Sequence, residues 1–135
     1  AQFFKNLMQQ NVASSTKNVI FIAHTLATYS EENMAMEVKV PIKGALKNNG
    51  LEAYFSTVIS TKRVPLKKLE GYESGLLTIT EEEEELGFKY CFQTKITKET
   101  VSERIRAPMG MFSNKQTYAD NDIQVILDHL HNYYQ

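Results

Sequence analysis

The feature that most constrains the fold is an uninterrupted apolar run at residues 19–23, with the sequence Val-Ile-Phe-Ile-Ala, followed at once by His24 and Thr25. Continuous apolarity without alternation is typical of a strand that is covered on both faces, as in the interior of a parallel sheet. Residues 1–14 precede it and carry apolar side chains at helical spacing. A helix that leads into such a strand is half of a βαβ unit, so the pattern predicts an α/β fold.

The middle of the chain combines turn signals with short periodic segments. Residues 26–36 have no clean period, and we predict a mobile loop there at the carboxyl edge of the apolar strand. We further expect short strands at 37–40 and 57–61, a short helix at 42–49 closed by Gly50, another turn at 51–55, and a polar loop or hairpin at 62–75.

The last third of the chain has clearer signals. Thr80 and Glu83 form a capping-box pattern that opens a short helix, and Gly87 would close it. Residues 88–97 alternate and 101–106 continue as a second strand, which predicts an antiparallel hairpin. A terminal amphipathic helix follows, capped by Asp120 or Asn121.

Composition predicts a single domain over residues 1–135, because this length leaves little room for two cores. Fifteen Lys and Arg against sixteen Asp and Glu give a formal charge of −1, so no global charge attracts nucleic acid or an anionic membrane. Cys91 is the only cysteine, which excludes an internal disulfide and favours a reducing compartment. We expect no membrane partner, because no apolar run approaches the roughly 20 residues of a membrane helix.

Several catalytic motifs are absent from the sequence. No phosphate-gripping glycine loop with its lysine occurs, and no GxSxG, HExxH or CxxC pattern. The chain is therefore not a complete NTP-hydrolysing enzyme by itself. We expect no metal site either: the glutamates at 81–85 spread around a helix, and His129 and His131 point apart.

His24 is the first candidate functional residue. It lies at the carboxyl tip of the predicted buried strand, where open α/β sheets bind their ligands. There an imidazole can donate a hydrogen bond to a phosphate or a water. The structural alternative is a cap that the backbone satisfies at the end of the strand.

Arg104 and Arg106 are two residues apart on a predicted strand and would share a face, with Lys95 or Lys98 joining them from the paired strand. Two guanidinium groups on one face repel unless an anion lies between them, and a phosphate would suit their planar donors. The structural alternative is a solvated face paired with Glu103 or Glu99.

A small basic cluster is the candidate for nucleic-acid binding. Tyr54 and Tyr72 are near it in sequence, and interleaved aromatic residues can stack on single-stranded bases. Glu70 and Glu73 dilute the charge, so an ordinary surface loop is the alternative. The cluster consists of Lys62, Arg63, Lys67 and Lys68.

The order of these segments resembles a phage protein family. The matching segments are residues 18–25, Val40 to Leu46, Tyr54-Phe55, Arg104-Ile105-Arg106-Ala107-Pro108, and Asp120-Asn121-Asp122 with the helix after it. They are similar to the RecA-like (AAA-type) ATP-binding proteins of tailed phages, which are linked to single-strand annealing and recombination. The resemblance covers most of the chain but corresponds only to the carboxyl-terminal half of the family.

The resemblance implies a partial RecA-like sheet of the P-loop NTPase type with flanking helices, followed by an antiparallel hairpin and a helix. The glycine-rich loop and the acidic strand end of the family would lie upstream of Ala1. ATP and magnesium are therefore expected only in the complete protein, and no cofactor for this chain alone. Whether the chain is part of an enzyme stays open at this point.

Residue roles also follow from the resemblance. His24 would be the γ-phosphate sensor, and residues 26–36 the element that it orders. Arg104 and Arg106, with Lys95 at the nucleotide, would act as finger residues towards a neighbouring subunit. The implied partners are the missing amino-terminal half or a neighbouring subunit of a homo-oligomer, and single-stranded DNA. The implied setting is DNA recombination or replication in the cytoplasm of an infected bacterial host.

The alternative function is a stand-alone phage protein-interaction module without NTPase activity. Its distinguishing feature would be a large exposed apolar patch that a partner or a second copy covers. Phe3, Phe4 and residues 19–23 are the candidates for that patch.

Overall fold

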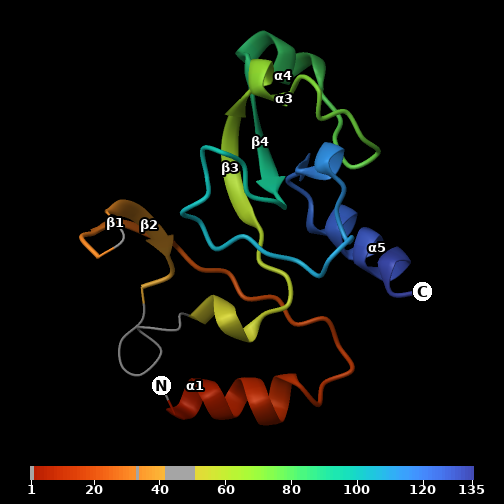
Figure 1. The fold of residues 1–135 in the computed structure, drawn as a ribbon. Coiled ribbons are helices and arrows are strands. Elements are labelled where there is room, and N and C mark those ends of the chain that lie inside the picture. The colour runs from red at the N-terminus through yellow and green to blue at the C-terminus, as the bar shows by residue number, and fades with distance from the viewer. Residues whose placement is uncertain (1, 33, 42–50) are drawn as a thin grey trace. The chain divides into compact units, whose positions relative to one another are not determined.

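The computed structural model describes residues 2–32, 34–41 and 51–135. Within it the chain forms two compact units, one of residues 1–55 with 102–104, the other of residues 56–101 with 105–135. Each unit contains one sheet (Figure 1). The predicted helix at 42–49 and its closing Gly50 lie outside the described residues.

The first unit begins with the predicted amphipathic helix. Helix α1 spans Gln2–Asn6 and continues without a break as a π-helical segment, Leu7–Val12. The apolar side chains face one side of this helix: Met8 is buried, and Phe4, Leu7 and Val12 are half-buried. Lys5 and Gln9 are exposed. The helical periodicity of the sequence is therefore confirmed, as is the turn at 51–55, where Leu51–Tyr54 form a 3-10 helix.

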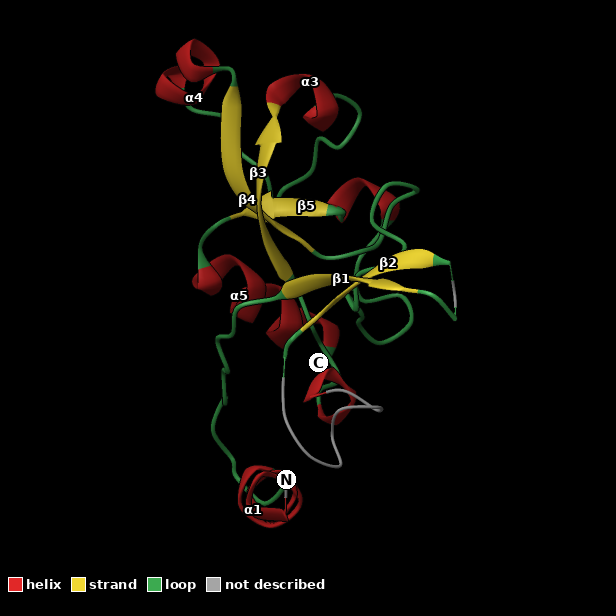
Figure 2. Ribbon diagram, turned by 90° about the vertical axis from the view of Figure 1, so that its left-hand side faces the viewer, coloured by secondary structure: helices red, strands yellow, loops and turns green. Residues whose placement is uncertain are grey.

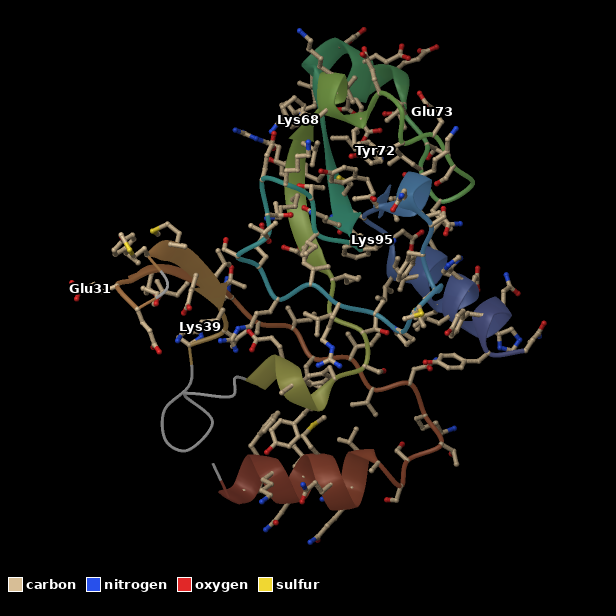
Figure 3. All side chains as sticks on the ribbon, viewed as in Figure 1. Glu31, Lys39, Lys68, Tyr72, Glu73 and Lys95 are labelled. Carbon is tan, nitrogen blue, oxygen red and sulfur yellow. The ribbon has the colours of Figure 1, made fainter. Side chains whose placement is uncertain are left out.

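The sheet of the first unit is a two-stranded hairpin. Strand β1, Leu26–Ser30, pairs antiparallel with β2, Ala35–Lys39, and Glu31 lies at the tip of this hairpin (Figure 3). The predicted mobile loop at 26–36 is therefore wrong, while the predicted strand at 37–40 is confirmed within two residues. The backbone groups of the two strands form hydrogen bonds with each other across a short connection. This pairing does not require alternating apolar residues, so the lack of a period in the sequence did not predict it.

The predicted partial RecA-like sheet is wrong. The described residues form two separate antiparallel sheets, and their parallel pairing is limited to an isolated bridge between Val38 and Glu103. Residues 19–23 belong to no helix or strand. A parallel interior strand needs neighbours at both of its edges. No described segment pairs with residues 19–23, so the apolar run lacks the sheet that its sequence predicts.

The second unit is built on a three-stranded antiparallel sheet in the order β3-β4-β5 (Figure 2). Strand β3 spans Ser60–Pro65, β4 spans Phe88–Gln93 and β5 spans Tyr118–Asp120. Ser60 lies opposite Gln93, and Cys91 opposite Asp120. The central strand β4 is thus hydrogen-bonded along both edges.

Two predictions about these strands need correction. Residues 62–65 complete β3 and residues 66–69 form helix α3, so the predicted loop at 62–75 is wrong over its first half. The predicted hairpin of 88–97 with 101–106 is also wrong, because β4 pairs with β3 and β5 instead. Residues 101–106 form isolated bridges at Glu103 and Arg106. Alternation identifies a strand but does not identify its partner.

The helix ends of the second unit follow local sequence signals. Helix α4, Glu81–Leu86, has the predicted capping box between Thr80 and Glu83, and Gly87 ends it with a positive φ of 79°. Helix α5, Ile123–Tyr133, confirms the terminal helix. Its cap is Asp122, whose side chain accepts from the Gln124 N–H at 2.9 Å, rather than Asp120 or Asn121.

Hydrophobic packing covers both faces of the sheet. On one face, Cys91 and Val64 pack with Leu69 and Tyr118, whose ring meets Tyr72 edge-on at 5.0 Å. A second cluster consists of Met111, Phe112, Ala119 and Ile126, with the half-buried Phe92 packed against it. Because Cys91 and Phe92 are neighbours on β4, the two clusters lie on opposite faces of the strand.

Candidate functional site

A pocket of about 270 Å³ lies in the second unit, formed by residues from 94–96 and from 105–112. It brings together two of the residues that the sequence selects, Lys95 and Arg106. Lys95 follows the end of β4 (Figure 3), and its ammonium donates to the Phe112 carbonyl at 3.3 Å. The lining contains no Asp or Glu. We call this site the Lys95–Arg106 pocket.

Arg106 is held in the pocket by its backbone. Its N–H donates to the Val58 carbonyl at 3.0 Å, and its carbonyl accepts from the Val58 N–H at 2.8 Å. Its side chain is exposed and forms no ion pair within the described part of the chain. The guanidinium group therefore remains available to an anion.

Arg104 belongs to the other unit and has a structural partner. Its guanidinium pairs with the buried Glu52 at 3.1 Å, and the other carboxylate oxygen of Glu52 accepts from the Val40 N–H at 2.7 Å. The predicted sharing of one strand face by Arg104 and Arg106 is not found. The acidic partner is Glu52 rather than Glu103 or Glu99. Glu52 lies 52 residues away in the sequence, so the spacing of residues within one segment does not predict this pair.

His24 does not occupy the predicted position. It is exposed and lies between the apolar run and β1, outside any helix or strand, so it is not at the tip of a covered strand.

The four predicted nucleic-acid-binding residues are divided between two elements. Lys62 and Arg63 lie on β3, where neighbouring side chains point to opposite faces, and Lys67 and Lys68 lie on α3. Lys68 pairs with Glu99 at 2.6 Å, and both side chains are more than half exposed. The four side chains therefore do not form one continuous basic face.

The structure instead places Arg63 beside two aromatic residues, Phe88 and Tyr90, that are not among the candidates for nucleic-acid binding. Arg63 lies opposite Tyr90 in the β3–β4 register, and its guanidinium is 5.2 Å from the centre of the Phe88 ring. Phe88 and Tyr90 meet edge-to-face at 5.6 Å, and Tyr90 is 56% exposed. We call these three residues the aromatic face. Their spacing at i and i+2 is visible in the sequence, but the partner strand is not.

The apolar run is exposed to solvent. Val19, Ile20 and Ile22 are 41%, 52% and 97% exposed. Phe21 is anchored on one side by edge-on contacts with Phe4 at 6.1 Å and Phe55 at 5.1 Å. Residues 18–25 form no backbone hydrogen bond with any described part of the chain. We call residues 19–23 the apolar segment; its backbone forms no backbone hydrogen bond among the described residues, and Ile22 projects into solvent.

A buried charged cluster has a structural role. Lys89 is 6% exposed, and its ammonium pairs with Glu83 at 2.9 Å and Asp120 at 3.3 Å. Burial alone would lower the pKa of Lys89, but the hydrogen bonds to the two carboxylates outweigh it and raise the pKa. Burial likewise opposes ionisation of Glu83, yet bonds from Thr80 and Lys89 hold its pKa below the usual value. The cluster ties α4, β4 and β5 together.

The remaining candidates are structural. Burial raises the pKa of the Cys91 thiol to about 11, so the thiol stays protonated and unreactive near neutral pH. In the described ranges no group of three or more His, Cys, Asp or Glu side chains is arranged to hold a metal ion. None of the helices there has the length and apolar character needed to cross a bilayer.

Comparison with known proteins gives no relative from which to transfer a function. No protein-family model, no curated protein and no solved structure matches this chain. The function must therefore be inferred from its surfaces.

Proposed function

We propose that this chain is a protein-interaction module whose apolar segment pairs as a β-strand with another polypeptide chain. The observation that carries the proposal is that residues 19–23 are apolar and exposed, belong to no helix or strand, and form no backbone hydrogen bond among the described residues. Such a segment offers an edge to which another strand can add.

The side chains favour pairing over simple exposure. The ring of Phe21 packs against Phe4 and Phe55, which anchors the segment on one side, while Ile22 projects almost fully into solvent. Burial of one such aliphatic side chain stabilises an interface by about 2 kcal/mol. A strand-forming run of β-branched and aromatic residues gains this energy together with its backbone hydrogen bonds only when a second strand covers it.

For the isolated protein, the available partner is a second copy of the same chain. Two identical segments can pair about a twofold axis, so that each supplies the same surface to the other. We therefore expect a concentration-dependent dimer in sedimentation equilibrium. Ile22→Lys should weaken dimerisation by about a hundredfold or more, because the change is made twice in a symmetric interface.

The matched control is Met109→Lys, which places the same charge on a side chain that is 96% exposed outside the segment. We expect it to dimerise as the unmodified protein does. A protein that stays monomeric up to sub-millimolar concentrations would contradict the proposal, as would equal effects of the two substitutions.

A different polypeptide could cover the same segment in the cell. The family resemblance implies an amino-terminal half that carries the phosphate loop. An edge strand of that half would pair with residues 19–23 in place of a second copy. In that assembly, Lys95 and Arg106 would contribute to a nucleotide held by the other half, in the cytoplasm of an infected bacterium. Co-expression of the two halves should then give a complex that Ile22→Lys disrupts and Met109→Lys leaves intact.

The aromatic face favours a second candidate function, binding of single-stranded nucleic acid. Tyr90 offers an exposed ring on which a base can stack, and Arg63 beside Phe88 can contact a phosphate. Tyr90→Ala should weaken binding of labelled oligothymidylate about tenfold in fluorescence anisotropy, whereas Tyr90→Phe should retain it. Tyr134→Ala, which removes another exposed ring, is the control. An affinity for oligothymidylate that is unchanged in Tyr90→Ala, or that does not fall with added salt, would exclude this function.

A further inference from the structure

The Lys95–Arg106 pocket carries positive charge that the described part of the chain does not neutralise. Lys95 and Arg106 both line it, and neither forms an ion pair with a described carboxylate. Two cations that line one pocket repel each other, and an anion bound between them would relieve that repulsion. The charge of the pocket therefore selects an anionic ligand.

The rest of the lining is mostly apolar. Ile96, Ile105, Met109 and Phe112 contribute walls on which an apolar group can pack. Phe112 is 4% exposed, and its ring is stacked on His129 with centres 4.8 Å apart and planes inclined by 16°. This wall is fixed by packing, so the pocket can accept a compact apolar body beside the anionic group.

Several hydrogen bonds hold the pocket in place before any ligand binds. The paired bridge with Val58 fixes the backbone of Arg106. Thr94 is 1% exposed, and its hydroxyl donates to the Gln116 carbonyl at 2.7 Å. The Lys95 ammonium uses one donor on Phe112 and keeps others for a ligand. Preformed geometry of this kind lowers the entropic cost of binding.

We propose that the Lys95–Arg106 pocket binds a small organic oxyanion, a carboxylate or a phosphate monoester, through Lys95 and Arg106, with its apolar group against Phe112. The proposal goes beyond the interaction function, because it concerns a site in the second unit that does not include the apolar segment. The pocket volume of about 270 Å³ sets the size of the ligand at that of a single ring rather than a chain.

The test uses four probes of graded chemistry on the full chain: benzoate, phenyl phosphate, inorganic phosphate and the neutral benzyl alcohol. Binding is followed by amide chemical shifts in two-dimensional NMR. We expect benzoate or phenyl phosphate to shift the amides of 94–96 and 105–112 with a saturable dissociation constant. The stronger of these two probes identifies the anionic group that the pocket prefers.

Substitutions assign the binding to the two cations. Arg106→Met should weaken binding of the preferred probe about tenfold, and Arg106→Lys should restore part of the loss. Because the Arg106 side chain is exposed and makes no ion pair with the described residues, its replacement leaves the fold intact. Lys98→Met, which removes an exposed cation that does not line the pocket, should leave the affinity unchanged.

Four results would overturn the proposal. The first is the absence of saturable shifts at the pocket with both aromatic anions. The second is benzyl alcohol binding as tightly as the anions, which would remove the role of the charges. The third is inorganic phosphate binding as tightly as the aromatic anions, which would remove the role of the apolar wall. The fourth is an equal loss of affinity in Lys98→Met, which would indicate non-specific attraction.

Discussion

Lys89 is a buried charged residue with only 6% of its surface exposed. A lysine buried to this extent stays ionised in the folded protein only if a negative charge lies beside it. Glu83 from α4 and Asp120 from β5 supply it. Asp120 also accepts from the Thr78 N–H at 2.9 Å and its hydroxyl at 2.8 Å. One ammonium thus links β4 to the neighbouring helix α4 and to β5, which is distant in sequence.

Removal of this ammonium should destabilise the second unit. Lys89→Met keeps the bulk of the side chain but leaves the carboxylates of Glu83 and Asp120 without their cation. Both carboxylates are 21% exposed, which softens the penalty, so we expect a loss of about 2 kcal/mol in the free energy of unfolding by urea. Lys98→Met is the control, and equal stability of the two variants would contradict the structural role of Lys89.

The pH dependence of stability should reveal Glu83. Its pKa is lowered in the folded state, so its contribution is present above its ordinary value of 4.5 and is lost as the pH falls through the lowered one. The stability difference between the unmodified protein and Glu83→Gln should therefore be largest near neutral pH and shrink below about pH 4. Glu82→Gln is a matched control on the same helix. A difference that persists unchanged in acid would refute this account.

Residue-level predictions from sequence succeed where the cause is local. The capping box of Thr80 and Glu83 follows from neighbours in the chain and is confirmed. Asp120, the second partner of Lys89, and Glu52, the partner of Arg104, come from distant segments, and no spacing rule points to them. For the same reason Lys95 and Arg106 were selected as candidates, but the pocket that joins them was not predicted.

At the scale of elements, the end of α4 depends on a single backbone conformation. Gly87 has a φ of 79°, which costs an L-residue about 1 kcal/mol, and no described heavy atom lies within 4 Å of a Cβ placed there. Gly87→Ala should therefore lower the free energy of unfolding by about 1 kcal/mol through backbone strain alone.

Gly75→Ala is the control for this substitution. Gly75 has an equally open surrounding but no left-handed backbone, so alanine there should be neutral or slightly stabilising. The free energy of unfolding of each variant is measured in urea. Equal changes for Gly75→Ala and Gly87→Ala would contradict the claim that the left-handed backbone at residue 87 requires glycine.

Elements were predicted from sequence more reliably than their pairing. The first and last helices, α4 and the strand at 88–93 are confirmed, because each depends on periodicity or capping within one segment. The hairpin at 26–39 and the partners of β4 were not predicted, since strand pairing depends on contacts between segments. The apolar segment shows most clearly what sequence patterns cannot predict. Its pattern predicts a strand buried on both faces, but among the described residues no sheet or helix buries it.

At the scale of the whole molecule, the two units differ in how much of their apolar surface they bury. Both hydrophobic clusters belong to the second unit, whereas Met8 is the one fully buried hydrophobic residue among the described part of the first. A unit with so little buried apolar surface gains stability from any partner that covers its exposed segment. The interaction proposed for residues 19–23 would therefore contribute to folding as well as to binding.

Hydrogen–deuterium exchange of the amides at residues 19–23 tests the central claim most directly, because it reports on the backbone that the partner strand would pair with. In the unmodified protein we expect these amides to become protected as concentration rises through the dimer range. Ile22→Lys should leave them unprotected, and Met109→Lys should behave like the unmodified protein. Rapid exchange at 19–23 at every concentration, while the amides of β4 stay protected, would contradict strand pairing by the apolar segment.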